Sequence, residues 1–325
     1  MPASPLVTSV VPDRAVGRGR ITLRGSGLAG TDGSTAFVGE APARISFASD
    51  GRLILIVPDE VDGGLVPIGL DDATLSHVWI GGSCATGLHQ VDNPVFDPAG
   101  NLFVTYSGSR GQEAPVSIFR VTRAGTREPF VSGIVNATSM AFGPDGRLYV
   151  SSRFDGAVYR IADDGSHEQV AADLGVACGL AFDDEGAMYV GDRSGTIFRI
   201  LDTRATPFAT LPPSVAAFHL AMSPSGELFV SGPTLASYDH IYRIDRRGHV
   251  STVSTPLGRP QGLAFAPDGT LYVVDALVGA SAVYRFAADD HSPEVMISGG
   301  ALVGIGFGPN GEIAVASNET AYRFD

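Results

Sequence analysis

Short apolar runs that alternate with polar residues recur along the whole chain, separated by clusters of Gly, Pro and Asp. Such runs predict β-strands, because a strand turns successive side chains to opposite faces. No stretch of convincing length has the 3.6-residue periodicity of an amphipathic helix. The 41 Gly and 21 Pro residues favour tight turns and oppose long helices. We therefore predict an all-β protein.

One unit occurs six times from residue 93 onward. Each unit has an apolar run, a turn containing Gly and a second apolar run, as in SMAFGPDGRLYVSS (139–152) and GLAFAPDGTLYVVD (262–275). A third run follows with an aromatic residue before Arg, and a weaker fourth run follows it in five units. The turn glycines are Gly100, Gly146, Gly186, Gly226, Gly269 and Gly311. Four strands in about 40 residues are typical of one blade, so the repeats predict a six-bladed β-propeller.

The sixth unit has three runs where the others have four. Residues 77–82, HVWIGG, stand upstream of the first unit in the register of an outer strand. We expect them to supply the missing outer strand of the last blade, since this closes the ring and pairs an exposed edge. The expected domains are therefore residues 1–76 and 77–325.

Residues 1–76 do not follow the repeat, and their short strand-like runs predict a β-sandwich. This segment resembles the IPT/TIG family of immunoglobulin-like domains. The matching elements are Pro5, Pro12, ITLRGSGL (21–28), AFVGEAPARI (36–45), LILIVP (53–58) and VPIGL (66–70). The resemblance implies a spacer or interaction module that is not itself catalytic.

The six units resemble NHL-type repeats and the gluconolactonase, strictosidine-synthase and paraoxonase propellers. The pattern GLAFxPDGxLYV carries this resemblance over about three quarters of the chain. It implies the fold more firmly than an activity, because one fold hosts binders, lactonases and lyases.

The gluconolactonase resemblance implies a divalent metal held by carboxylate and Asn oxygens at the mouth of the central channel. The carboxylate position falls on Asp92, and Asn93 follows it. The positions of the family's Asn ligands carry other residues: Thr138, Cys178, Phe218, Gln261 and Val303. This set is a poor cage for a hard cation. We expect no cofactor, with Ca²⁺ or another divalent cation at Asp92 as the alternative.

In such propellers, the heads of the inner strands and the loops after the second strands share one face. The candidate ligand-binding residues on it are Asp92, Asn93, Thr138, Arg153, Asp192, His219, Tyr238, His240, Gln261 and Asp275. Asp92 and His219 are also the candidates for catalysis, His219 as a proton carrier. The competing interpretation makes Asp–Arg neighbours such as Asp192 and Arg193 surface ion pairs, and the loop at Tyr238 a solvated one.

The net charge of −13 and the pI near 4.9 oppose binding to nucleic acid or anionic membranes. No apolar run is long enough to span a membrane. Cys84 and Cys178 are far apart in sequence, and we expect two unpaired thiols. The start of the chain lacks a basic segment followed by an apolar run, so we expect a cytoplasmic protein, with a mature secreted form as the alternative.

These observations favour a non-catalytic binding or scaffolding protein whose channel face meets a partner protein or a small ligand. The alternative is a metal-dependent lactonase or esterase of the gluconolactonase type with a degenerate site. A third hypothesis is a metal-free enzyme of the strictosidine-synthase type, for which His219 is the available acid or base.

Overall fold

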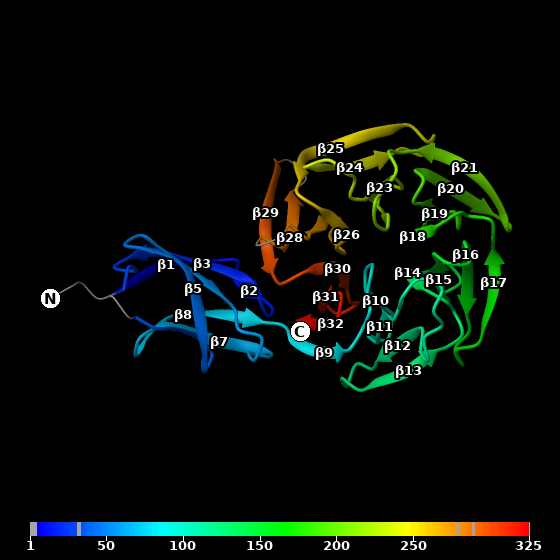
Figure 1. The fold of residues 1–325 in the computed structure, drawn as a ribbon. Helices are drawn as coiled ribbons and strands as arrows, with labels where there is room; N and C mark the ends of the chain where they lie inside the picture. The colour runs from blue at the N-terminus through cyan, green and yellow to red at the C-terminus, as the bar shows by residue number, and fades with distance from the viewer. Residues whose placement is uncertain (1–4, 31–33, 278–279, 288–289, 325) are drawn as a thin grey trace.

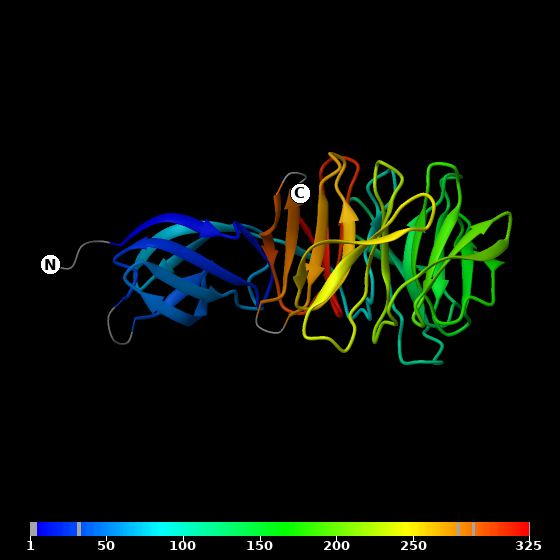
Figure 2. The same cartoon turned by 90° about the horizontal axis from the view of Figure 1, so that it is seen from above.

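The computed structural model describes residues 5–30, 34–277, 280–287 and 290–324. Figures 1 and 2 show two domains side by side, a smaller one and a ring of strands. The described residues contain strands and turns and no helix, which confirms the all-β prediction. None of their segments could cross a membrane as an apolar helix.

The first domain is a two-layered β-sandwich. Its strands are β1 (Leu6–Val11), β2 (Arg14–Ala15), β3 (Arg20–Ser26), β4 (Ala36–Val38), β5 (Ala41–Ser49), β6 (Arg52–Ile56), β7 (Gly64–Leu70) and β8 (Ala73–Ile80). Strands β1, β3, β6 and β5 follow one another in the sheet, and β5 also pairs with β4, which leads to β7 and β8. Alternate residues of β3 and β6 form the core, including Ile21, Leu23, Leu53 and Leu55. The predicted sandwich is confirmed.

Five separate four-stranded sheets form most of the ring (Figure 1). Four of them follow the chain order from the channel outward. Their strands are β10 (Val95–Phe96), β11 (Leu102–Thr105), β12 (Ile118–Val121) and β13 (Arg127–Val131); β14 (Ala137–Phe142), β15 (Leu148–Ser152), β16 (Ala157–Ile161) and β17 (His167–Ala171); β18 (Ala177–Phe182), β19 (Met188–Asp192), β20 (Thr196–Leu201) and β21 (Arg204–Thr210); and β22 (His219–Met222), β23 (Leu228–Ser231), β24 (Asp239–Ile244) and β25 (Val250–Leu257). The fifth is β30 (Leu302–Phe307), β31 (Ile313–Ser317), β32 (Thr320–Phe324) and β9 (Gly82–Thr86).

The prediction of six blades is wrong in its count of separate sheets. The strands of the fifth repeat are β26 (Pro260–Phe265), β27 (Leu271–Asp275), β28 (Ala282–Ala287) and β29 (Asp290–Ser298). They pair in that order, but they form the end of a 12-stranded sheet that continues into the first domain. The cause is β2, which pairs in parallel with β8 on one side and β29 on the other.

An N-terminal outer strand does complete the last sheet, but it is not residues 77–82. Strand β9 pairs antiparallel with β32, with Ala85 opposite Ala321. Residues 77–80 belong to β8, where Val78 and Ile80 are buried in the sandwich core. The alternation of HVWI suits the sandwich, and the chain passes to the ring at Gly81.

The turns and arginines of the repeat have structural roles. Gly146 has a φ of 72°, the left-handed conformation that such a turn needs and that Gly adopts without steric cost. Five of the six repeated arginines form ion pairs with carboxylates, namely Arg120, Arg160, Arg199, Arg243 and Arg285. The sixth, Arg323, donates to the carbonyl of Arg123.

The two domains share more than a sheet edge. The backbone amide of Val16 donates to the carbonyl of Ser298 at 2.9 Å, and the backbone amide of Gly300 donates to the carbonyl of Gly17 at 3.0 Å. The Val16 side chain is 1% exposed and packs in the core of the ring with Ile297 and Leu302. The first domain therefore contributes a core residue to the second.

Candidate functional site

Six inner strands surround the central channel of the ring: β10, β14, β18, β22, β26 and β30. Two cavities lie along it. The channel cavity, about 350 Å³, opens toward the turn glycines and has residues of all six inner strands in its wall. The mouth cavity, about 260 Å³, lies at the heads of these strands and is defined below.

A layer of polar side chains separates the two cavities, and glycines make room for it. A Cβ at Gly262 would lie 2.2 Å from Oδ1 of Asn93, and one at Gly304 would lie 2.6 Å from the carbonyl oxygen of Asp92. Real Cβ atoms do not approach other atoms so closely. Gly at these two strand heads is therefore what allows Asp92 and Asn93 to enter the channel.

Asp92 and His219 meet in this layer. Asp92 precedes β10 in the first repeat and His219 begins β22 in the fourth, so the two come from opposite sides of the ring (Figure 1). Nδ1 of His219 donates to Oδ1 of Asp92 at 2.6 Å, and the side chains are 0% and 2% exposed. The pair bridges the channel. Nε2 of His219 is buried without a hydrogen-bond partner in the described part of the chain.

Asn93 fixes the same layer to the backbone of two other repeats. Its Nδ2 donates to the carbonyl of Leu263 at 2.8 Å, and its Oδ1 accepts from the amide of Ile305 at 3.0 Å. Its own amide donates to Oδ1 of Asp92 at 2.7 Å. Both ends of the side-chain amide are thus committed to strands β26 and β30.

The mouth cavity lies on the other side of this layer, on the face predicted for ligand binding. Its polar lining comes from several repeats: Gln90, Arg153, Cys178, Arg193, Gln261 and Asn318. Its apolar lining consists of Val91, Val215, Ala216, Ala217 and Val303. Of the sequence candidates, Arg153 and Gln261 are therefore here, while Asp92 and His219 lie in the layer behind.

Arg153 and Arg193 donate to backbone carbonyls at the mouth. Arg153 donates to the carbonyl of Gly108 at 3.1 Å, and Arg193 to that of Val215 at 3.0 Å. Neither forms an ion pair with a carboxylate among the described residues. Burial lowers the pKa of Arg153, and the charges of Arg193 and Arg110 lower it further. Their acidic neighbours in sequence are engaged elsewhere, so the predicted alternative of surface ion pairs is wrong for them.

The acidic neighbours instead hold loops. Asp192 accepts from the amide of Val176 at 2.8 Å and from the hydroxyl of Ser194. Asp275 accepts from the amides of Gly258 and Arg259, at 3.0 and 2.7 Å. These bonds fix the backbone around the mouth.

Three further candidates lie outside the mouth cavity. Thr138 is fully buried and donates to the carbonyl of Asn136 at 2.8 Å. Tyr238 is 63% exposed on the loop before β24. His240 is half-buried in β24, and its Nδ1 has no partner among the described residues.

Neither cysteine forms a disulfide bond within the described part of the chain. Cys178 is fully buried at the base of the mouth cavity, and burial raises the pKa of its thiol to about 12. It is therefore neutral near pH 7 and a poor nucleophile.

The residues at the mouth do not fit a divalent metal ion. No group of three or more His, Cys, Asp and Glu side chains is placed to hold one in the described part of the chain. Oδ1 of Asp92 already accepts two hydrogen bonds, and the Asn93 amide is bonded to backbone at both ends. If these oxygens bound a metal ion instead, the buried donors that they now accept from would lose their acceptors, which costs free energy.

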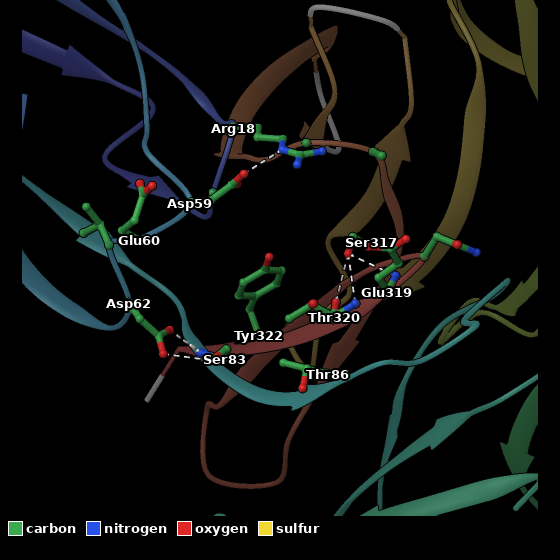
Figure 3. A pocket seen from close by; sticks show the side chains of 15 residues that line it. Arg18, Asp59, Glu60, Asp62, Ser83, Thr86, Ser317, Glu319, Thr320 and Tyr322 are labelled. Atoms are coloured by element: carbon green, nitrogen blue, oxygen red, sulfur yellow. Dashed lines mark hydrogen bonds and ion pairs between the residues drawn. The ribbon is translucent and has the colours of Figure 1, made fainter. Parts of the chain in front are cut away.

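A larger cavity, about 670 Å³, lies at the junction of the two domains (Figure 3). Arg18 donates to Asp59 at 2.9 Å on its first-domain side. Asp62 of the first domain accepts from the amide and hydroxyl of Ser83 in β9, at 2.6 and 2.7 Å. These bonds connect the first domain to the strand that completes the ring. We interpret this junction cavity as part of the docking between the domains.

Comparison with known proteins places the first domain. Residues 5–83 match the IPT/TIG domain. None of the curated proteins matches the chain in sequence. The IPT/TIG match includes all of β1–β8, which the resemblance in the sequence predicted.

Solved structures share the fold at low identity. A gluconolactonase from Xanthomonas campestris has a TM-score of 0.63 and 16% identity over 89% of this chain and 96% of its own. An auxiliary nutrient binding protein from Bacteroides ovatus has a TM-score of 0.56 and 13% identity over 99% and 97%. Virginiamycin B lyase from Staphylococcus aureus has a TM-score of 0.54 and 16% identity over 94% and 98%. At these identities, the likeness concerns the fold.

Proposed function

We propose that this chain is a non-catalytic binding protein whose NHL-like propeller takes a small ligand at the mouth of its channel. The strands β26–β29 serve as the sixth blade in this proposal, and the boundary between the domains lies at Gly81. The observation that carries it is the Asp92–His219 pair. The two groups best suited to chemistry are hydrogen-bonded to each other across the channel and line neither cavity.

The metal-dependent lactonase is the weaker proposal. It needs carboxylate and amide oxygens free to converge on a cation. Here Asp92 and Asn93 are tied to His219 and to strands β26 and β30. The likeness to a gluconolactonase supports the fold of this alternative and not its chemistry.

One observation favours metal-free catalysis by His219. Its Nδ1 donates to a carboxylate and its Nε2 has no partner among the described residues, which is the orientation of a general base in a His–Asp pair. A base must reach a substrate proton at hydrogen-bond distance. The His219 side chain is 0% exposed, so a substrate would first have to open the layer.

Metal content, thermal stability and turnover test the proposal together. We expect substoichiometric metal by mass spectrometry, a melting temperature that neither EDTA nor Ca²⁺ shifts, and no hydrolysis of simple lactones. Lactone hydrolysis above background that His219→Gln abolishes while EDTA leaves it intact would refute the proposal in favour of His219 catalysis. A stoichiometric divalent ion, with turnover lost in EDTA and in Asp92→Asn, would refute it in favour of the lactonase.

A further inference from the structure

The two arginines at the mouth differ from most of the repeated arginines in the blades. Five of the six repeated arginines meet carboxylates, as expected for a chain with 35 acidic and 22 basic residues. Arg153 and Arg193 are half-buried and meet only backbone carbonyls. Each guanidinium has five N–H donors, so most of their donors are left for another partner.

A buried amide faces the same cavity. Gln261 is 8% exposed and lines the mouth cavity. Its side chain makes no hydrogen bond with the described residues, and only its backbone carbonyl accepts one, from Ser231. Its amide atoms are not among the fully buried unpartnered ones, so they are accessible from the cavity. Together with the arginines, Gln261 gives the cavity hydrogen-bond donors and positive charge that no carboxylate among the described residues balances.

The other charges near the mouth do not cancel this excess. Asp92 lies in the layer behind and is engaged by His219. Asp192 accepts from Val176 and Ser194, and Arg110 adds a further positive charge close to Arg153. Cys178 is neutral, since burial raises the pKa of its thiol.

We propose that the mouth cavity binds a small organic carboxylate, with Arg153 and Arg193 holding the carboxylate and Gln261 donating to it. This inference rests on the proposed function and names its ligand class. The apolar wall of Val91, Val215 and Val303 suits a short aliphatic body. The volume of about 260 Å³ is below the usual drug-sized range of about 300–1,000 Å³, so the body is a few carbons long.

Butanoate and butanamide test this proposal, because they have nearly the same shape and differ in charge. Titrations of the full chain, followed by ligand-observed NMR, give the Kd of each. We expect butanoate to bind at least about tenfold more tightly than butanamide, since hydrogen bonds to ionised groups are the stronger ones. We expect its affinity to fall as NaCl is raised.

Two variants and a matched control locate the site. Arg153→Gln and Arg193→Gln should each weaken butanoate binding about tenfold or more, because each removes a charged partner. Arg247→Gln removes the same charge at an exposed turn of the β24–β25 hairpin and should leave the Kd unchanged. Melting curves without ligand should show that both mouth variants are folded.

The outcomes separate the two proposals. Equal Kd values for butanoate and butanamide refute the carboxylate site and leave a binding protein for neutral ligands. The same conclusion follows if Arg153→Gln and Arg193→Gln bind butanoate as tightly as the unsubstituted chain. Wild-type affinity for butanoate weaker than about 10 mM refutes it as well. Inorganic phosphate that binds tighter than butanoate overturns the carboxylate in favour of a phosphorylated ligand. The metal and lactone measurements decide the proposed function independently.

Discussion

Breaking the Asp92–His219 pair should destabilise the ring strongly. Asp92→Ala leaves both ring nitrogens of His219 buried without a partner among the described residues. It also removes the carboxylate that accepts a hydrogen bond from the backbone amide of Asn93. Removing one partner of a buried hydrogen bond to a carboxylate costs about 1–3 kcal/mol or more, because the group left behind is unsatisfied. His219→Ala leaves the buried carboxylate without its imidazole partner and should cost a similar amount.

A double-mutant cycle isolates the pair from the volume that each substitution removes. The double variant lacks both groups, so it should be more stable than the sum of the singles implies, by about 2–3 kcal/mol. Urea unfolding followed by far-UV circular dichroism measures this through the midpoint, with the slope showing whether the transition stays cooperative. The expected sign is set by burial, because an unpaired buried group is more costly than a missing pair.

An exposed histidine supplies the matched control. His249 and Asp245 also approach within 3.0 Å, but the histidine side chain is 75% exposed. His249→Ala should leave the unfolding midpoint unchanged, because water replaces the lost partner. The reasoning fails if the Asp92 and His219 effects add to within about 0.5 kcal/mol, as independent sites do.

Three further variants or reagents test the layer, the thiol and the domain junction. Gly262→Ala should cost about 1–3 kcal/mol in urea unfolding, because its Cβ overlaps Asn93. Gly51→Ala should be neutral, because its Cβ would make only an ordinary contact, 3.7 Å from the carbonyl oxygen of Gly25. Equal effects of the two substitutions would contradict the role of the glycine layer. Cys178, whose thiol pKa is raised to about 12, should stay unmodified by iodoacetamide at pH 8 until the protein unfolds, and its labelling in the folded state by mass spectrometry would show that the cavity base is open. Val16→Asp places a carboxylate in the core of the ring and should uncouple the unfolding of the two domains. The unfolding curve from fluorescence of the single Trp, which lies in the first domain, should then differ from the curve from circular dichroism. Coincident curves in this variant would show that the junction does not depend on Val16.

The repeat could be predicted from the sequence because every unit carries the same local signals. A Gly-containing turn between two apolar runs specifies a hairpin without knowledge of the rest of the chain. The closing strand was harder to predict, since HVWIGG and the GSCAT segment after it are both short and both apolar enough to form an outer strand. The choice depends on whether Val78 and Ile80 have a core to enter, and that core belongs to the sandwich.

The merging of β26–β29 with the first domain carried no comparable signal. Strand β2 has two residues, Arg14 and Ala15, and two residues show no periodicity. Its pairing with β29 joins positions more than 280 residues apart in the chain. Arg153 was predicted at the mouth from its position after a second strand, but its lack of an acidic partner could not be predicted. That depends on the donors that the two neighbouring carboxylates accept from. Asp155 accepts from the hydroxyls of Ser152 and Tyr159. Asp192 accepts from the amide of Val176 and the hydroxyl of Ser194.

The central layer, in contrast, does leave a signal in the sequence, at the first residue of each repeat. The first residue of each unit is, in order, Asn93, Ser139, Gly179, His219, Gly262 and Gly304. The two large polar residues, Asn93 and His219, occupy the first and fourth of the six units, and the small residues occupy the other four. Asp92, the residue before Asn93, is the one that meets His219 across the channel. Opposite large groups can meet only if their neighbours leave space, and a Cβ at Gly262 or Gly304 would overlap Asn93 or Asp92. The same reasoning applies to other propellers: where a repeat position is small in most units and bulky and polar in two opposite ones, those bulky residues and the residues before them are the first to examine for a bridge across the channel.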